Sequence, residues 1–213
     1  MLSFEGDIMK VYDSDIRRLL FDSFCLKEEY MMLDDTIVVN EMDICAGLSR
    51  ADIVVINGEL NGYEIKSQRD NLNRLPAQIE YYNAIFDTMT IVAYSSHVNK
   101  VLEIVPEWWA INSVVEDNGS LKLVQVRDGT YNHETNILNI TMLLWRDEMI
   151  ELLLSTNDIS IGLGGKTRKQ LSSILVNTIA HATLAEHVRR ILKSRQEWKA
   201  VLIQRLNDDL HNM

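Results

Sequence analysis

The sequence predicts a mixed α/β core followed by a C-terminal α-helical appendage. Short β-branched runs and two Asn-Gly turns mark strands in the first part of the chain, and helical periodicity dominates from about residue 136 onward. A chain of 213 residues is long enough to bury a sizeable core. We therefore expect an α/β core over 1–130 and a helical domain over 131–213.

The core begins with a helix that Asp13 or Ser14 can cap, because apolar residues then recur at helical spacing. Asn57-Gly58 and Asn118-Gly119 are typical of two-residue hairpin turns. Pro76 is tolerable only in the first turn of a helix, which places that helix's start near it. The remaining elements are expected as strands over 36–40, 51–56, 59–67, 90–94, 110–115 and 121–126, and as a helix over 73–87.

The C-terminal half contains two features that need interpretation. Thr183 and Glu186 match a capping box, which predicts a new helix starting there. Gly165-Lys166-Thr167 resembles the end of a phosphate-binding loop, but Ser160 stands where that loop requires glycine and no parallel strand leads into it. We interpret this segment as a flexible start of a helix.

The composition excludes several classes of protein. Charged residues at 24% and hydrophobic residues at 46% are ordinary for a globular domain. Two cysteines argue against a disulfide scaffold and a cysteine-based zinc site. Because there is no signal-peptide pattern and no apolar run of about 20 residues, we expect a cytoplasmic protein without a membrane partner.

The net charge of −10 argues against a nucleic-acid partner, yet the charges are unevenly distributed. Residues 1–159 carry −15, whereas 160–205 carry +7. The basic segment indicates either a solvated helix face or a surface that follows a phosphate backbone. The candidate nucleic-acid-binding residues in it are Lys166, Arg168, Lys169, Arg189, Arg190 and Lys193.

Charged residues interrupt the first hairpin where hydrophobic ones would be expected. Glu64 and Lys66 are two residues apart in a strand and so project from one face, with Asp52 on the partner strand. A strict two-residue turn would place Asp52 opposite Tyr63 instead of Glu64. We expect one extra residue in the ladder, as a bulge at Asn61-Gly62.

Two carboxylates held close together repel unless a cation lies between them. Oxygen ligands suit Mg²⁺, for which Mn²⁺ can substitute, so Asp52, Glu64 and the Ile65 main-chain carbonyl are candidate metal ligands. Lys66 would then lie beside a metal-bound water. The alternative is an exposed hairpin edge carrying solubilising charges, but the flanking strands are hydrophobic, which favours the functional interpretation.

The spacing D-x(11)-E-x-K on a hairpin, followed by a helix carrying Gln78 and Tyr82, resembles the PD-(D/E)xK nuclease superfamily, in particular its RecB-like branch with a Q-x-x-x-Y motif. Over about 13–115 the chain looks like a small bacterial and phage group of that superfamily. The resemblance implies a restriction-endonuclease-like fold, metal ligation by Asp52 and Glu64, a catalytic Lys66, and Gln78 and Tyr82 as active-site supports. Ala51 stands where the motif has proline, a departure that many members of the superfamily share.

Further polar residues near this hairpin have open roles. Glu41 alternates with Ile37 and Val39 along the preceding strand, and is either a further catalytic or metal-binding residue or a helix cap or salt-bridge partner of Arg50. Arg50, Arg69 and Arg74 can bind phosphates or balance the acidic cluster, and Arg74 is the one we assign to nucleic acid.

From these patterns we expect a Mg²⁺-dependent nuclease that hydrolyses phosphodiester bonds, with DNA favoured and RNA possible as in a ribonuclease toxin. The alternative is a nucleic-acid-binding or protein-interaction module, partner-dependent or homodimeric, with little catalysis of its own.

Overall fold

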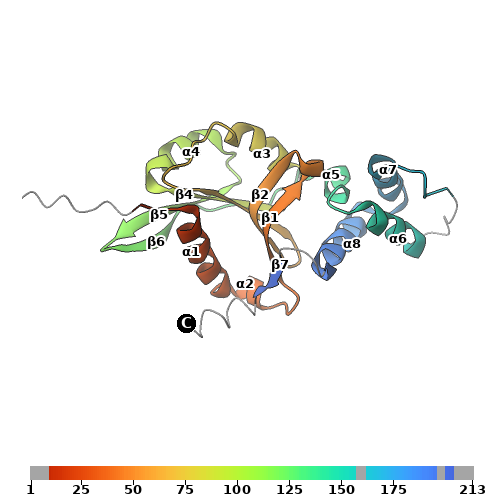
Figure 1. Cartoon of the computed structure of the whole chain (residues 1–213), viewed down its shortest axis with the longest axis horizontal. Helices are drawn as coiled ribbons and strands as arrows, with labels where there is room; N and C mark the ends of the chain where they lie inside the picture. Colours follow the sequence, from red (N-terminus) through yellow and green to blue (C-terminus); the bar gives the residue numbers. More distant parts are fainter. Residues whose placement is uncertain (1–9, 157–161, 196–199, 204–213) are drawn as a thin grey trace, which may run out of the picture.

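The computed structural model describes residues 10–156, 162–195 and 200–203, and within them the chain forms one seven-stranded mixed sheet flanked by helices (Figure 1). The strand order across the sheet is β6-β5-β4-β3-β2-β1-β7. The β3–β4 and β4–β5 pairs are parallel, and the other neighbouring pairs are antiparallel. The strands are β1 (Ile37–Ile44), β2 (Ser49–Ile56), β3 (Leu60–Lys66), β4 (Thr88–Tyr94), β5 (Ala110–Asp117), β6 (Ser120–Arg127) and β7 (Ala200–Leu202).

Helices cover both faces of this sheet (Figure 1). The crossover helices α3 (Leu75–Asn83) and α4 (Val98–Ile104) pack on one face, and α1 (Asp13–Cys25) and α2 (Glu28–Met31) pack on the other. Parallel neighbours need such crossovers, because a tight turn can join only antiparallel strands. The largest buried side chains lie on these two faces, among them Trp109 and Tyr82 on the α3 face and Phe24 and Tyr30 on the α1 face.

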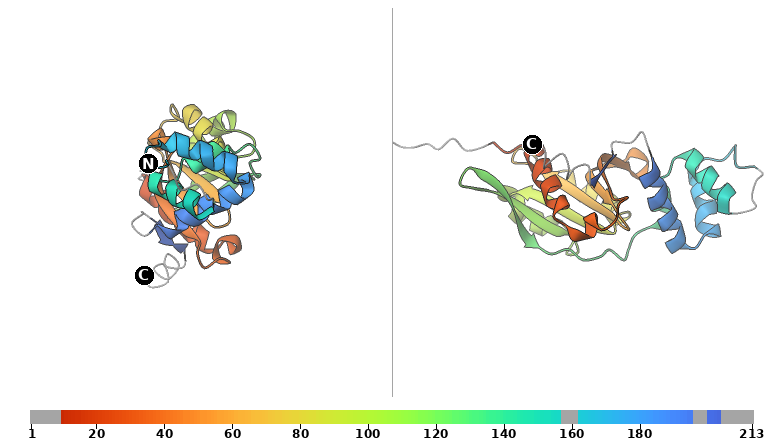
Figure 2. Two further views of the ribbon diagram at one scale, coloured as in Figure 1. Left: turned by 90° about the vertical axis from the view of Figure 1, so that its right-hand side faces the viewer. Right: turned by 90° about the horizontal axis from the view of Figure 1, so that it is seen from below.

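The C-terminal helices form a group at one end of the sheet, as the view from below shows (Figure 2). They are α5 (Ile137–Thr141), α6 (Arg146–Thr156), α7 (Arg168–Thr178) and α8 (His181–Ser194). After α8 the chain returns to the sheet, where β7 becomes the edge strand and pairs with β1 through Val201 opposite Val38. None of the helices in the described parts of the chain combines the length and the apolar character that crossing a bilayer requires.

The predicted fold class is confirmed, with local differences. Pro76 lies in the first turn of α3, but that helix is shorter than the expected 73–87. The capping box predicted at Thr183 is wrong, because α8 already begins at His181. Thr167 instead forms the capping box of α7 with Gln170, so Lys166 and Thr167 lie at the start of a helix, while Ser160 lies outside the described residues. The sequence patterns missed α4 and β7.

Candidate functional site

The β2–β3 hairpin turns through three residues rather than two. Ile56 pairs with Leu60 and Ile53 with Tyr63, so Asn57, Gly58 and Glu59 form the loop. The Asn57 side-chain oxygen accepts a hydrogen bond from the Glu59 N–H, which closes the loop. The extra residue that brings Asp52 level with Glu64 is therefore in the turn.

The bulge expected at Asn61-Gly62 is absent from the regular β2–β3 ladder, so this prediction is wrong. Gly62 is needed for close packing, because a Cβ atom there would lie 2.6 Å from the Met89 sulfur and 2.9 Å from the Phe86 ring. Sequence alone cannot distinguish a glycine that bends a strand from one that makes room for a neighbour.

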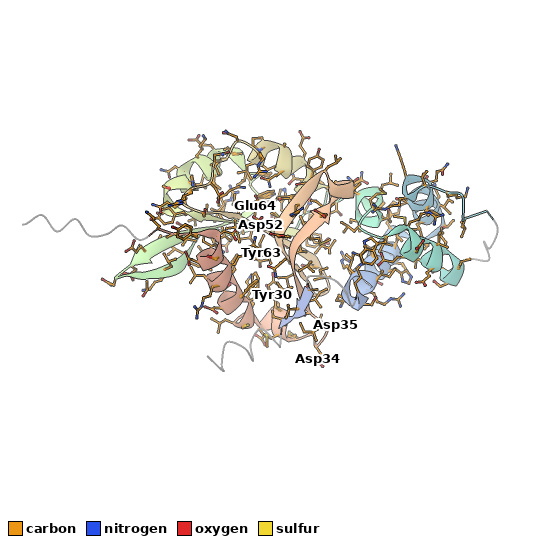
Figure 3. All side chains as sticks on the ribbon, viewed as in Figure 1. Tyr30, Asp34, Asp35, Asp52, Tyr63 and Glu64 are labelled. Carbon is orange, nitrogen blue, oxygen red and sulfur yellow. The ribbon has the colours of Figure 1, made fainter. Side chains whose placement is uncertain are left out.

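Strands β2 and β3 separate at Asp52. The paired register of these two strands ends at Ile53 opposite Tyr63, and beyond it the Ile65 N–H donates to Asp52 Oδ2 at 2.8 Å. A side-chain carboxylate thus takes the place of the strand's backbone acceptor. The separation opens the sheet locally, and Asp52 and Glu64 lie next to each other at this point (Figure 3).

Glu64 is held by side chains from its own strand and from α3. Its Oε1 accepts from Lys66 Nζ and, at 2.9 Å, from Gln78 Nε2. Its Oε2 accepts from the Tyr82 hydroxyl at 2.6 Å. Gln78 Nε2 is also 3.1 Å from the Tyr82 hydroxyl, so the residues one helical turn apart on α3 act together on one carboxylate.

The negative charges of Asp52 and Glu64 are not fully offset by the cations around them. Burial, and then the charge of Glu64, raise the pKa of Asp52 to about 7. Burial and the same Glu64 charge raise the pKa of Tyr82, which keeps its hydroxyl protonated as a donor. Lys66 is the nearest counter-charge, and it contacts Glu64 rather than Asp52. The other Asp52 oxygen, Oδ1, lies 3.9 Å from the Arg17 guanidinium.

Asp52, Glu64, Lys66 and Gln78 line a pocket of about 610 Å³. Its wall contains six carboxylate side chains and three cationic ones, so its formal charge is negative. The carboxylates are Asp13, Glu41, Asp43, Asp52, Glu64 and Asp70, and the cations are Arg50, Lys66 and Arg74. The start of α3 contributes its N-cap residue Arg74 and, from the helix itself, Ala77 and Gln78 to this wall.

Glu41 lies in the pocket wall, but not on the face that the alternation with Ile37 and Val39 predicts. Its φ of 53° is in the left-handed region, and across it the β1 residues that belong to the core on the α3 face change from odd positions, Ile37 and Val39, to even positions, Met42 and Ile44. Glu41 is exposed and 3.7 Å from Arg50, which also bonds Asp43 at 2.9 Å. The expected salt bridge to Arg50 is thus present, and the alternative catalytic or metal-binding role of Glu41 stays a prediction.

The donor set meets the minimum requirement of Mg²⁺ and no more. That ion is satisfied by one or two carboxylates plus water and phosphate oxygens, and Asp52 and Glu64 with the Ile65 carbonyl would supply that minimum. No cluster of three or more His, Cys, Asp or Glu side chains able to hold a metal ion occurs among residues 10–156, 162–195 and 200–203. The pair thus fits a weakly held hard cation with several waters.

The basic residues of the C-terminal helices do not form one free surface. Arg189 reaches Asp87 at 2.9 Å and Lys193 reaches Asp35 at 2.6 Å, so both contact carboxylates of the α/β core. Arg168 donates to the Met142 and Leu144 carbonyls. Lys169 and Arg190 are exposed and Lys166 is half-buried. None of these six residues lines the pocket around Asp52.

Arg17 of α1 is a site residue that the motif reading missed. Its guanidinium donates to the Asp52 carbonyl at 3.0 Å and to the Asn40 side chain at 3.2 Å, and its Nε bonds Asp13. It therefore fixes the backbone where β2 leaves β3. The signal available in the sequence was the Asp13–Arg17 spacing of four, which pairs charges on one helix face.

Comparison with known proteins places the chain outside the nuclease superfamily. A family model described as "Bacteriophage P4 protein cII" matches residues 10–212. "Protein cII" of Enterobacteria phage P4 is 26% identical over 164 residues, which are 77% of this chain and 61% of that relative, so the match spans less than two thirds of the relative's length. No solved structure matches the chain significantly.

This finding overturns the assignment drawn from D-x(11)-E-x-K. The resemblance to the PD-(D/E)xK superfamily is wrong as a statement of family, because the matching family covers nearly the whole chain and is a different one. The expected phosphodiester hydrolysis and the enzyme and hydrolase classes are wrong with it. The geometry around Asp52 and Glu64 stands independently of that name.

Proposed function

The chain belongs to the bacteriophage P4 protein cII family, and within that family we propose that it binds nucleic acid, without hydrolysing it, through a divalent cation held at Asp52 and Glu64. The observation that carries the proposal is the pair of adjacent carboxylates at the point where β2 and β3 separate. The pair opens into a pocket whose rim carries Arg50 and Arg74.

Because the pocket is negatively charged, nucleic acid can bind there only if a cation offsets that charge. A phosphate diester would be repelled by six carboxylates facing three cations. A divalent ion at Asp52 and Glu64 offsets that repulsion and supplies a Lewis-acidic contact for a phosphate oxygen. Cation binding and nucleic-acid binding should therefore strengthen each other by the same factor.

The chain's own residues have separate roles in this proposal. Lys66, Gln78 and Tyr82 hold Glu64 in one position, so that little ordering is needed when a ligand arrives. Arg74 is exposed in the wall beside the first turn of α3, where the helix dipole also favours an anion. Arg50 lies across the pocket and can exchange Asp43 for a phosphate oxygen.

The test measures binding of a labelled 20-nucleotide DNA by fluorescence anisotropy at constant ionic strength, with Mg²⁺, with Ca²⁺ or with EDTA. We expect the affinity to rise about tenfold or more with the divalent ion, since each tenfold factor corresponds to about 1.4 kcal/mol of coupling. Gel analysis should recover the DNA at its original length. An RNA of the same sequence, run in parallel, decides which nucleic acid binds more tightly.

Asp52→Asn removes one carboxylate and keeps an acceptor for the Ile65 N–H, so it should abolish the dependence on the divalent ion. Asp117→Asn makes the same charge change on the exposed β5–β6 hairpin and serves as the matched control. An affinity that is equal in Mg²⁺ and EDTA for the wild-type protein would contradict the proposal.

We place this activity in the cytoplasm, where nucleic acid and free Mg²⁺ occur together. A second copy of the chain or another protein could extend the binding surface. Light scattering of the complex gives its stoichiometry and decides between one copy and two.

A further inference from the structure

A second groove lies on the other side of the β1–β2 hairpin, between that hairpin and the loop joining α5 to α6. Its volume is about 490 Å³. It shares Glu41, Asp43, Gly47 and Arg50 with the Asp52 pocket, so these hairpin residues border both hollows. Its opposite wall carries Trp145 and Arg195 from the C-terminal helices.

Trp145 is an exposed indole on a fixed support. Its side chain is 54% exposed, although it precedes α6 directly and its backbone N–H donates to Glu148 Oε2 at 2.6 Å. The Arg195 guanidinium lies 4.1 Å from the centre of the indole ring. A large aromatic side chain left exposed yet held in place is typical of a binding surface.

Arg195, which lies against the indole ring, is buried and forms a bidentate salt bridge with Glu148. Arg195 Nε and Nη2 each reach a Glu148 oxygen at 2.7 Å, and Nη2 also donates to the Leu143 carbonyl at 2.8 Å. The Arg195 side chain is only 6% exposed. Glu148 thus orders both the start of α6 and the cation beneath the indole, so stacking a ligand on Trp145 costs little conformational entropy.

We propose that Trp145 stacks on an unpaired base of a single strand whose phosphates pass over Arg50 toward the Asp52–Glu64 pocket. This inference rests on the proposed function and names its ligand class as single-stranded nucleic acid. Stacking on a side chain requires the open face of a base, which the interior of a duplex does not offer. Arg50, common to both hollows, lies between the stacking surface and the proposed cation.

The test compares a labelled 20-nucleotide single strand with the same sequence as a duplex, in Mg²⁺, for wild-type protein, Trp145→Ala and Trp145→Phe. We expect Trp145→Ala to weaken single-strand binding about tenfold or more, and Trp145→Phe to restore most of it, because stacking needs an aromatic ring. Duplex binding should be weaker in the wild type and unchanged by either substitution. Single-strand binding should also quench tryptophan fluorescence, and Trp145→Phe should lose that quenching.

Leu154→Ala is the matched control, because Leu154 is a half-exposed apolar residue of α6, the helix that Trp145 directly precedes, and lies outside the groove. It should leave both affinities unchanged. If Trp145→Ala leaves single-strand affinity unaltered while Asp52→Asn still abolishes the Mg²⁺ dependence, the stacking inference is wrong and the proposed function stands. If Trp145→Ala weakens both forms of DNA equally, the single-strand assignment is wrong. If no nucleic acid binds to the wild-type protein under any condition, the proposed function itself has failed.

Discussion

The two ends of strand β3 both place an aspartate against a backbone N–H, yet the two arrangements have opposite electrostatics. At the start of the strand, Asp87 accepts from the Leu60 N–H at 2.7 Å, from Arg189 at 2.9 Å and from the Tyr131 hydroxyl at 2.9 Å. At its end, Asp52 accepts from the Ile65 N–H, and the charge that most raises its pKa is that of another carboxylate, Glu64.

This difference distinguishes Asp87, a carboxylate that stabilises the fold, from Asp52, a carboxylate that is a candidate for binding a ligand. Asp87 is 2% exposed and paired with a cation, so its charge is neutralised within the fold. The Asp52 side chain is 28% exposed and opens to a pocket, and its pKa is raised to about 7. A carboxylate that the fold leaves unbalanced is a candidate for a function, whereas one that the fold balances is a candidate for stability.

The largest loss of stability is expected at the start of β3, where Asp87 is paired with Arg189. Asp87→Ala leaves the Arg189 guanidinium, whose side chain is 14% exposed, without its carboxylate, and should lower the free energy of unfolding by about 3–5 kcal/mol in urea denaturation. Adding Arg189→Met to Asp87→Ala should recover part of that loss, because the buried charge is then removed too. A loss below about 1 kcal/mol for Asp87→Ala would show that the ion pair does not stabilise the fold.

An intermediate effect is expected in the middle of β3. Gly62→Ala forces a Cβ against the Met89 sulfur and the Phe86 ring, and should cost about 1–3 kcal/mol of unfolding free energy through overpacking. Gly58→Ala in the adjoining loop is the matched control, since a Cβ there meets nothing within 4 Å, and it should change stability by no more than about 0.5 kcal/mol. Equal stability of the two variants would be inconsistent with close packing at Gly62.

The smallest change in stability is expected at the end of β3, where Asp52 lies beside Glu64. Here the substitution should stabilise the protein rather than destabilise it. Because the pKa of Asp52 is higher in the folded protein than its ordinary value of 3.8, the folded state binds the proton more tightly than the unfolded state does. Wild-type stability should therefore fall as the pH rises from about 4 to about 7 and level off above that. Asp52→Asn should lack this loss and be more stable than wild type by about 1 kcal/mol at pH 8, with no gain at pH 4.

Urea denaturation in EDTA at the two pH values measures this difference. Asp117→Asn, which changes an exposed carboxylate paired with Lys122, should follow the wild-type pH dependence. Parallel curves for wild type and Asp52→Asn would mean that Asp52 ionises in the folded protein as easily as in water.

The local elements of the fold could be predicted because they depend on local signals. Strand β2 with its neighbour β3, and the position of Pro76 in α3, follow from alternation and from the restricted backbone of proline. Strand β7 could not be predicted from its own sequence. It consists of three residues whose strand conformation depends on pairing with β1, more than 160 positions away.

Part of the candidate site could also be predicted from local signals. Asp52, Glu64 and Lys66 lie on one hairpin, and the helix that follows it brings Gln78 and Tyr82 to them, so spacing along the chain was sufficient. Arg17 and Trp145 approach the site from other elements, which local spacing does not report. The family assignment failed because a few spaced residues describe a local geometry, and a local geometry does not determine descent or activity.

Strand β7 also determines how far the C-terminal helices can move. Helices α5 to α8 leave the sheet after β6 and rejoin it at β7, on the opposite edge, so the helical group is attached at two points. A rigid-body rotation about either connection is restrained by the other, and the Asp87–Arg189 contact adds a third restraint. The spacing between Trp145 on the helices and Arg50 on the hairpin is thus set by the sheet itself. A single strand bound as proposed would have to span that distance.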